Sequence, residues 1–279
     1  MDAVTPLADQ IGRVAELDLQ QLADTTHEAL TIPDEWVAEY AEFQSGGWLT
    51  LSLYNDTGDP RDVAIRDCEA QETELLRRMP ATRELLHSLD LRYMWARVAR
   101  LRPNSFLWEH RDYGELADRE RHRLHIPLQT NASAALVAGG AWIHLRAGNI
   151  WCLAPENPHG ACNLTGPDRL HLIMDCYGDE VFRRLAGRTE LTEGDVIRLP
   201  AAEPADLADG IDRAALLAEL GYQPAAERSL LRLFYRYSLA EGQVYDLIAG
   251  MYQRLGDDVR ASSWRDKRKA MLGAESWPS

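Results

Sequence analysis

Residues 122–154 read HRLHIPLQTNASAALVAGGAWIHLRAGNIWCLA, in which short strand-like runs alternate with turn residues. The runs are HRLHIPLQT, AALVA, AWIHL and NIWCLA. Asn131, Gly139-Gly140 and Gly148-Asn149 lie between them. Several short strands at this spacing, separated by turn signals, are typical of an all-β sandwich or barrel.

The same pattern continues on both sides of that segment. LRYMWARVARL at 91–101 and SFLWEH at 105–110 precede it, and RLHLIMDCY at 169–177 follows it. An earlier run, WLTLSL at 48–53, lies between two turn clusters and predicts a further strand. The chain from about 91 to 177 is therefore predicted to be a β core.

Helical periodicity flanks this core on its N-terminal side. Residues 15–44 and 70–89 place apolar residues at helical spacing, and Pro80 interrupts the second segment. Together with the strands, these helices predict a first domain over residues 1–198.

The C-terminal part of the chain has a different character. Residues 195–210 contain prolines and many small or acidic residues, which predicts a linker. Residues 211–219 and 225–272 carry apolar stripes at helical spacing. We therefore expect a C-terminal helical domain over residues 199–279.

Composition restricts the possible partners. The 279 residues are 46% hydrophobic and 27% charged, with a net charge of −14, which is ordinary for a globular protein. The negative charge disfavours nucleic acid and anionic membranes, because both attract positive protein surface. No apolar run approaches the roughly 20 residues that span a bilayer. The expected partner is a small molecule.

The cysteines and the N-terminus bear on the compartment. The four cysteines show no CxxC spacing, which indicates reduced thiols, and MDAVTPLADQ carries no apolar signal segment. A cytoplasmic location is expected.

The residues with the clearest chemical meaning lie inside the β region. On an extended segment, His110 and Asp112 point to the same face, because strand side chains alternate with a period of two. His159 on a distant strand could complete a set of two imidazoles and one carboxylate, which suits the facial triad of non-haem Fe(II) oxygenases. Arg169, ten residues further on, could bind a carboxylate through its planar fork.

The same ligand set also suits other chemistry. Two histidines and one aspartate can bind Zn²⁺, so a zinc hydrolase or isomerase on a cupin-like barrel remains an alternative. A cupin-like binding module with a vestigial site is a further one. The arginine, and the absence of an HExxH motif, favour iron.

The sequence resembles the aspartyl/asparaginyl β-hydroxylase-like group of 2-oxoglutarate-dependent dioxygenases. The resemblance rests on LRPNSFLWEHRDYGELADRERHRLHIPLQTN and on GGAWIHLRAGNIWCLAPENPHGACNLTGPDRLHLIMDC. FQSGGWLTLSLYN and the helical C-terminus are similar to the bacterial proline hydroxylase branch, in particular the proline 3-hydroxylases.

The resemblance implies a double-stranded β-helix core, also called a jelly roll or cupin-like fold, with Fe(II), 2-oxoglutarate and O₂. It implies that His110, Asp112 and His159 are the iron ligands and that Arg169 holds the distal carboxylate of 2-oxoglutarate. Arg123 and His125 match an RxH element that acts at a carboxylate of the co-substrate or substrate. An aspartate at 112, where halogenating relatives have a small residue, implies hydroxylation.

The activity expected from this resemblance is hydroxylation of a small free amino acid, proline or a relative, with succinate and CO₂ as co-products. The alternative within the same class is hydroxylation of an aspartyl or other residue in a peptide, or of a carrier-bound amino acid. Three other histidines are expected to have no role in metal binding. His122 is predicted to lie in a solvated loop, and His144 and His171 are predicted to be barrel residues that are not ligands. Four residues are candidates for the pocket: Arg100, Arg102, Asn163 and Asp175.

Overall fold

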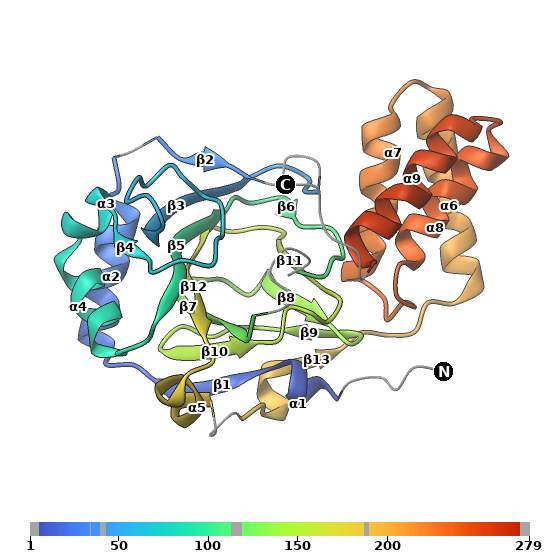
Figure 1. Cartoon of the computed structure of the whole chain (residues 1–279). Coiled ribbons are helices and arrows are strands. Elements are labelled where there is room, and N and C mark those ends of the chain that lie inside the picture. The colour runs from blue at the N-terminus through green and yellow to red at the C-terminus, as the bar shows by residue number, and fades with distance from the viewer. Residues whose placement is uncertain (1–5, 34, 40–42, 113–118, 187–189, 274–279) are drawn as a thin grey trace.

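The computed structural model describes residues 6–33, 35–39, 43–112, 119–186 and 190–273. Within these residues the main strands form two antiparallel sheets (Figure 1). The order of the larger sheet is β1-β10-β7-β12-β5-β3-β2, with β4 beside β3. Its strands are β1 Ile11–Glu16, β2 Val37–Ala38, β3 Trp48–Asn55, β4 Gln71–Glu72, β5 Tyr93–Leu101, β7 Arg121–Gln129, β10 Asn149–Leu153 and β12 Arg169–Tyr177.

The smaller sheet has the order β13-β9-β8-β11-β6. Its strands are β6 Ser105–Phe106, β8 Ala134–Ala138, β9 Ala141–Ile143, β11 His159–Asn163 and β13 Val196–Arg198. Residues from both sheets share buried clusters, such as the one that joins Leu101 and Ile173 of the larger sheet to Ala161 of the smaller one. The predicted double-stranded β-helix with flanking helices is confirmed.

Alternation along β7 and β12 separates the packing face of the larger sheet from its functional face. On β12, Leu170, Leu172 and Met174 point outward into a hydrophobic cluster beneath the N-terminal helices. The intervening residues Arg169, His171 and Asp175 are also buried, and they face the other side of the sheet. Both faces of the strand are buried, but only the inner face carries charged and polar side chains.

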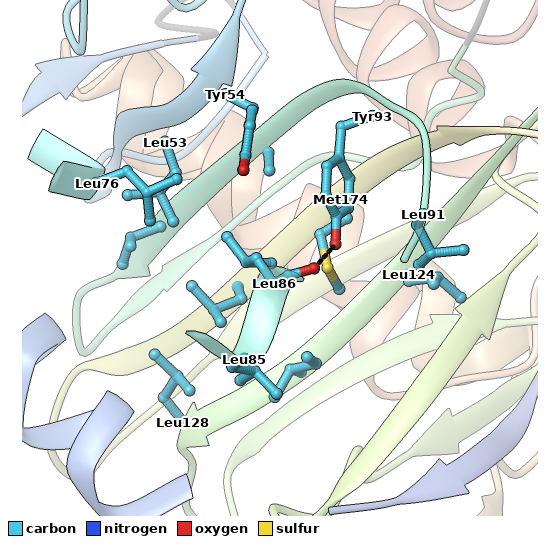
Figure 2. Packing of buried hydrophobic residues seen from close by; sticks show 14 of the residues in the cluster. Leu53, Tyr54, Leu76, Leu85, Leu86, Leu91, Tyr93, Leu124, Leu128 and Met174 are labelled. Carbon is cyan, nitrogen blue, oxygen red and sulfur yellow. Dashed lines mark hydrogen bonds between the residues drawn. The ribbon is translucent and has the colours of Figure 1, made fainter. Parts of the chain in front are cut away.

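Short helices cover the outer face of the larger sheet (Figure 1). Leu85 of α4 and Leu76 of α3 belong to the same buried cluster as Leu124 and Met174 of the sheet (Figure 2). Burial of such side chains contributes about 2 kcal/mol each, so this cluster fixes the sheet against its helices. The helices of this part of the chain are α1 Leu7–Gln10, α2 Leu19–Leu30, α3 Glu74–Arg77, α4 Pro80–Ser88 and α5 Glu180–Ala186.

The C-terminal helices form a module beside the smaller sheet (Figure 1). They are α6 Pro204–Glu219, α7 Gln223–Leu231, α8 Gln243–Arg254 and α9 Asp258–Leu272. Tyr245 and Trp264 lie in their core, and the same cluster includes Phe106 of β6 and Val137 of β8. The domain boundary between 198 and 199 stays a prediction.

Three predicted segments are wrong in detail. Residues 15–44 are not one helix: α2 ends at Leu30, shortly before Pro33, and Val37–Ala38 pairs with β3 instead. The part of that segment at 40–42 lies outside the described residues. Residues 195–210 are not a linker, because Val196–Arg198 pairs with β9 and α6 begins at Pro204, a favoured first helical residue.

The third error concerns the segment RSLLRLFYRYSL at 228–239, which has helical periodicity throughout but is α-helical only in its first part. Helix α7 ends at Leu231 and passes into a 3₁₀ turn, Arg232–Tyr235, where Tyr235 bonds to the β core. In the described part of the chain, no helix is long and apolar enough to span a lipid bilayer.

Candidate active site

Two histidines and one aspartate meet at one end of the β core. The ligand atoms of His110, Asp112 and His159 all lie within 4.8 Å of one another. His110 Nε2 lies 3.5 Å from Asp112 Oδ1, and His159 Nε2 lies 4.0 Å from Asp112 Oδ2. The backbones of the two histidines exchange hydrogen bonds of 2.9 Å in both directions, so the strand pairing itself brings the imidazoles together. The sequence prediction placed these three residues in one site, and the structure brings them together.

Hydrogen bonds fix the orientation of both imidazole rings. His110 Nδ1 lies 2.7 Å from the carbonyl oxygen of Trp108, and His159 Nδ1 lies 2.9 Å from that of Asn157. A carbonyl only accepts, so each Nδ1 carries the proton and each Nε2 keeps a free lone pair. Backbone carbonyls hold metal-binding histidines in this way.

The charge states also suit a divalent metal. Burial, and then the neighbouring His110, lower the pKa of His159 to about 3, so its ring is neutral. Burial would raise the pKa of Asp112, but Arg123 and the two histidines together hold it well below its usual range. A neutral imidazole and an ionised carboxylate are the forms that bind metal. The donor set and its hydrogen-bonded surroundings therefore fit a divalent cation with open coordination positions.

Arg169 is a buried cation without an acidic partner. Its side chain is 3% exposed, and no carboxylate among the described residues lies within ion-pair distance. Instead its Nε lies 3.1 Å from His171 Nε2 and its Nη2 lies 3.0 Å from His171 Nδ1. Burial lowers the pKa of Arg169 to about 10, and burial with Arg169 also keeps His171 neutral. A buried cation in this state is a strong attractor for an anionic ligand.

His125 lies beside this arginine. Its Nδ1 is 3.4 Å from His171 Nδ1, and its buried Nε2 has no hydrogen-bond partner in the described part of the chain. His171 was expected to be a non-ligand barrel residue, and it contacts Arg169 from the inner face of β12. Whether Arg123 or His125 acts at a ligand carboxylate stays a prediction.

A second group of charges adjoins the triad. Arg123 contacts Asp112 through Nη1 and Asp175 through Nε, the latter at 3.0 Å. Arg97 also approaches Asp175, with Nη1 at 3.4 Å, and its guanidinium stacks on the Trp95 ring at 3.6 Å. The Nε atom of Arg97 is buried and has no hydrogen-bond partner among the residues described.

Glu39 completes this group and could not be recognised from the sequence. It is 8% exposed and accepts from Trp48 Nε1 at 3.3 Å. Burial raises the pKa of Glu39, while the positive charges of Arg97 and Arg123 act to lower it. Both arginines are therefore close enough to Glu39 to interact with it electrostatically. The residue falls in the segment that was wrongly predicted as helix, and a lone glutamate there gives no signal of a buried site.

Other candidates lie outside the site. Arg100 has the opposite strand parity to Arg97; it pairs with Asp168 at 3.6 Å and stacks on Trp36. The side-chain amide of Asn163 donates to the carbonyls of Leu101 and Pro167, so its role is to hold the backbone of these two segments together. Arg102 is exposed, and His122 lies on β7 rather than in a loop, stacked on Phe182.

The sequence of this chain matches a known family and several known proteins. The model of the family described as Aspartyl/Asparaginyl beta-hydroxylase matches residues 16–178. L-proline cis-3-hydroxylase 1 of Streptomyces sp is 28% identical over 95% of this chain and 95% of its own length. L-proline cis-4-hydroxylase of Rhizobium meliloti (strain 1021) is 26% identical over 86% of this chain and 87% of its own.

Solved structures include distant neighbours. A Pseudomonas putida prolyl-4-hydroxylase has a TM-score of 0.41 and 18% identity, over 61% of this chain and 94% of that one. A 2OG-Fe(II) oxygenase family protein from Burkholderia pseudomallei has a TM-score of 0.43 and 14% identity, over 58% and 79%.

The double-stranded β-helix and its His-Asp-His cluster define the class of protein, a β core with a candidate divalent-metal centre. Within that class, the match over residues 16–178 shows that the chain belongs to the aspartyl/asparaginyl β-hydroxylase family.

Proposed function

We propose that this protein hydroxylates a small free amino acid, proline or a close relative, with 2-oxoglutarate as co-substrate. The observation that carries the proposal is the pairing of an open His-Asp-His triad with a buried arginine, Arg169, that has no acidic partner among the described residues. The identity to proline hydroxylases extends over almost the whole chain, including the C-terminal helices, and supports the amino-acid substrate.

His110, Asp112 and His159 are the residues that would hold the iron. When bound with 2-oxoglutarate and O₂, the metal supplies the oxidant that inserts oxygen into a substrate C–H bond. The protein holds the two rings through the Trp108 and Asn157 carbonyls, so the ligand atoms keep their positions through the reaction.

Arg169 is proposed to bind the distal carboxylate of 2-oxoglutarate. Its planar guanidinium can form two parallel hydrogen bonds to a carboxylate, and no acid in the described part of the chain competes for it. His171 and His125 lie beside it as neutral rings, since burial and the charge of Arg169 lower the pKa values of both. Their contribution is to orient the guanidinium without neutralising its charge.

The substrate is proposed to bind beside the second charge group. Glu39, Asp175, Arg97 and Arg123 provide two acids and two bases in a buried region. A free amino acid is a zwitterion, so its carboxylate and its ammonium can each meet an opposite charge there without leaving a net buried charge. The buried Nε of Arg97, which has no hydrogen-bond partner among the described residues, is the donor proposed to meet the substrate carboxylate.

A panel of substrates tests this proposal. The protein is incubated with Fe(II), 2-oxoglutarate, O₂ and single free L-amino acids, and products are analysed by mass spectrometry. We expect one added oxygen on proline or a close relative, with succinate formed in equal amount. Asp112→Ala, with the same additions, serves as the inactive control.

The family name itself favours a second candidate, an aspartyl or asparaginyl residue within a peptide. N-acetylated and amidated amino acids and short peptides separate the two, because they remove one or both charges of the zwitterion. Hydroxylation of peptides alone, or of a carrier-bound amino acid alone, would contradict the proposed substrate. Metal analysis of anaerobically purified protein addresses the zinc alternative. A cytoplasmic location stays a prediction.

A further inference from the structure

The C-terminal helices contact the chain segment that carries the first metal ligand. Tyr245 of α8 donates a hydrogen bond of 2.5 Å to the carbonyl of Glu109, the residue before His110. The amide of Gly242, at the start of the same helix, donates to Glu109 Oε2 at 3.0 Å. The amide of Arg111, which follows His110, donates to the Met271 carbonyl of α9 at 2.9 Å. His110 is thus bracketed on both sides by bonds to the helical module.

A second tyrosine joins this segment to the strand of the other histidine. The hydroxyl of Tyr235 donates its one proton between two carbonyl oxygens, that of Leu107 and, at 3.1 Å, that of Ala161. Leu107 belongs to the segment that leads to His110, and Ala161 follows His159 on β11. The Leu107 amide also donates to the Ala161 carbonyl at 2.8 Å, so one hydroxyl reinforces a junction that links both ligand segments.

Packing supports the same contact. Trp108, whose carbonyl orients the His110 ring, lies against Trp264 of α9 with ring centroids 5.1 Å apart and against Tyr245 at 6.5 Å. A side chain at Gly160 would collide with the Tyr235 hydroxyl and with the Phe234 ring. The glycine next to His159 therefore permits the close approach of the helical module.

We infer that Tyr245 and Tyr235 are positioning residues, through which the C-terminal helices hold the metal-ligand segments in register. The inference rests on the proposed metal site but concerns a part of the chain beyond the family match, which ends at residue 178. Tyr245 bonds to the carbonyl next to His110, and Tyr235 bonds to carbonyls on the two segments that carry His110 and His159. Loss of either hydroxyl should therefore change the metal affinity and not merely the stability of the module.

Binding of Co(II) to the full-length protein under anaerobic conditions tests this inference without any turnover. The titration follows the visible absorption of the bound ion. Loss of an outer hydrogen bond around a metal site typically weakens binding by about 10- to 100-fold. We expect Tyr245→Phe to raise the Kd for Co(II) by about 10-fold or more, and Tyr235→Phe to act in the same direction.

Tyr252→Phe is the matched control. Tyr252 is buried in the same module, and its hydroxyl bonds to Glu227 of α7 at 2.8 Å, away from the ligand segments. We expect this variant to lose thermal stability and to keep the wild-type Kd. If Tyr245→Phe and Tyr252→Phe both melt earlier and both bind Co(II) like the wild type, the positioning role is contradicted.

Gly160→Ala offers a second route to the same answer. The added methyl group should displace the Tyr235 hydroxyl and weaken Co(II) binding, and the effect should be smaller when Tyr235→Phe is already present. If the two substitutions change the free energy of Co(II) binding in a strictly additive way, the inference is contradicted. Failure of the wild-type protein to bind Co(II) would instead overturn the proposed metal site, and with it the positioning role.

Discussion

The guanidinium of Arg123 joins the candidate metal ligand Asp112 to Asp175, its register partner on the neighbouring strand β12. The side chain of Asp175 is fully buried, and Arg97 reaches it from strand β5 on the other side. Asp112 itself lies outside the named strands, two residues after the bridge between His110 and His159. Arg123 therefore helps to set the position of a ligand carboxylate that no strand pairing of the described residues holds.

Removing that arginine should be costly. Arg123→Met removes a positive charge that pairs with the carboxylates of Asp112 and Asp175. Breaking a buried ion pair in this way typically destabilises the folded state by about 3–5 kcal/mol. We expect a loss of that size in the free energy of unfolding, measured by urea denaturation. Arg100→Met is the control, since the pair of Arg100 with Asp168 is partly exposed and should contribute about 1 kcal/mol or less. Equal losses in the two variants would contradict the role of Arg123.

The metal ligands should act as a unit. Alanine at His110, Asp112 or His159 should abolish bound iron and hydroxylation together, because an open triad has no spare protein ligand. Metal content by mass spectrometry and succinate release report the two effects. His144→Ala, a histidine whose Nδ1 bonds to the Ala134 carbonyl, should leave both unchanged. Full hydroxylation by Asp112→Ala would show that the triad is misassigned.

Arg169 should determine the affinity for 2-oxoglutarate. Deleting one partner of a buried, bidentate ion pair costs several kcal/mol, so Arg169→Ala should raise the KM for 2-oxoglutarate by about 100-fold or more. The exposed Arg102→Ala is the control in the same steady-state assay. An unchanged KM would transfer the role to Arg123.

Glu109 should give the stability a specific pH dependence. Burial raises the pKa of this carboxyl from 4.5 to about 7 in the folded protein. The folded state therefore holds the proton more tightly than the unfolded state. The contribution of Glu109 to stability is complete below about pH 4.5 and is lost as the pH rises through about 7, by about 3 kcal/mol.

Glu109→Gln removes this titration and retains an acceptor for the Gly242 amide. We expect the stability of the wild type to fall relative to the variant between pH 5 and pH 8, as measured by chemical denaturation. The same substitution at the exposed Glu74 controls for a general charge effect. A difference between wild type and Glu109→Gln that is constant across this range would contradict the prediction.

The sequence allowed prediction of those site residues that belong to short, ordered motifs. His110 and Asp112 are two residues apart, and the positions of His159 and Arg169 complete a recognisable order. The contacts among Arg97, Arg123 and Asp175 depend instead on the register of three strands that are far apart in the chain. The sequence pattern indicated Arg100 and Arg102 as pocket candidates, whereas the register places Arg97, of the opposite parity, beside Asp175. Glu39 approaches the site only because Pro33 follows the end of α2 and the chain then pairs with β3.

The helical module shows a similar limit. Its apolar stripes predicted helices, but α7 ends at Leu231, and Tyr235 in the 3₁₀ turn that follows bonds to the β core. Periodicity indicates which residues of a helix are buried. It does not indicate that the hydroxyl of Tyr245 donates to the carbonyl of Glu109, beside the candidate ligand His110.

Turnover under ¹⁸O₂ tests the central claim most directly. The protein is supplied with Fe(II), 2-oxoglutarate and free L-proline, and both products are analysed by mass spectrometry. The proposed reaction predicts succinate carrying one ¹⁸O atom and, in equal amount, proline carrying one added oxygen, with neither product formed from N-acetylproline amide. Succinate without label, or a product formed equally well in the absence of O₂, would contradict it.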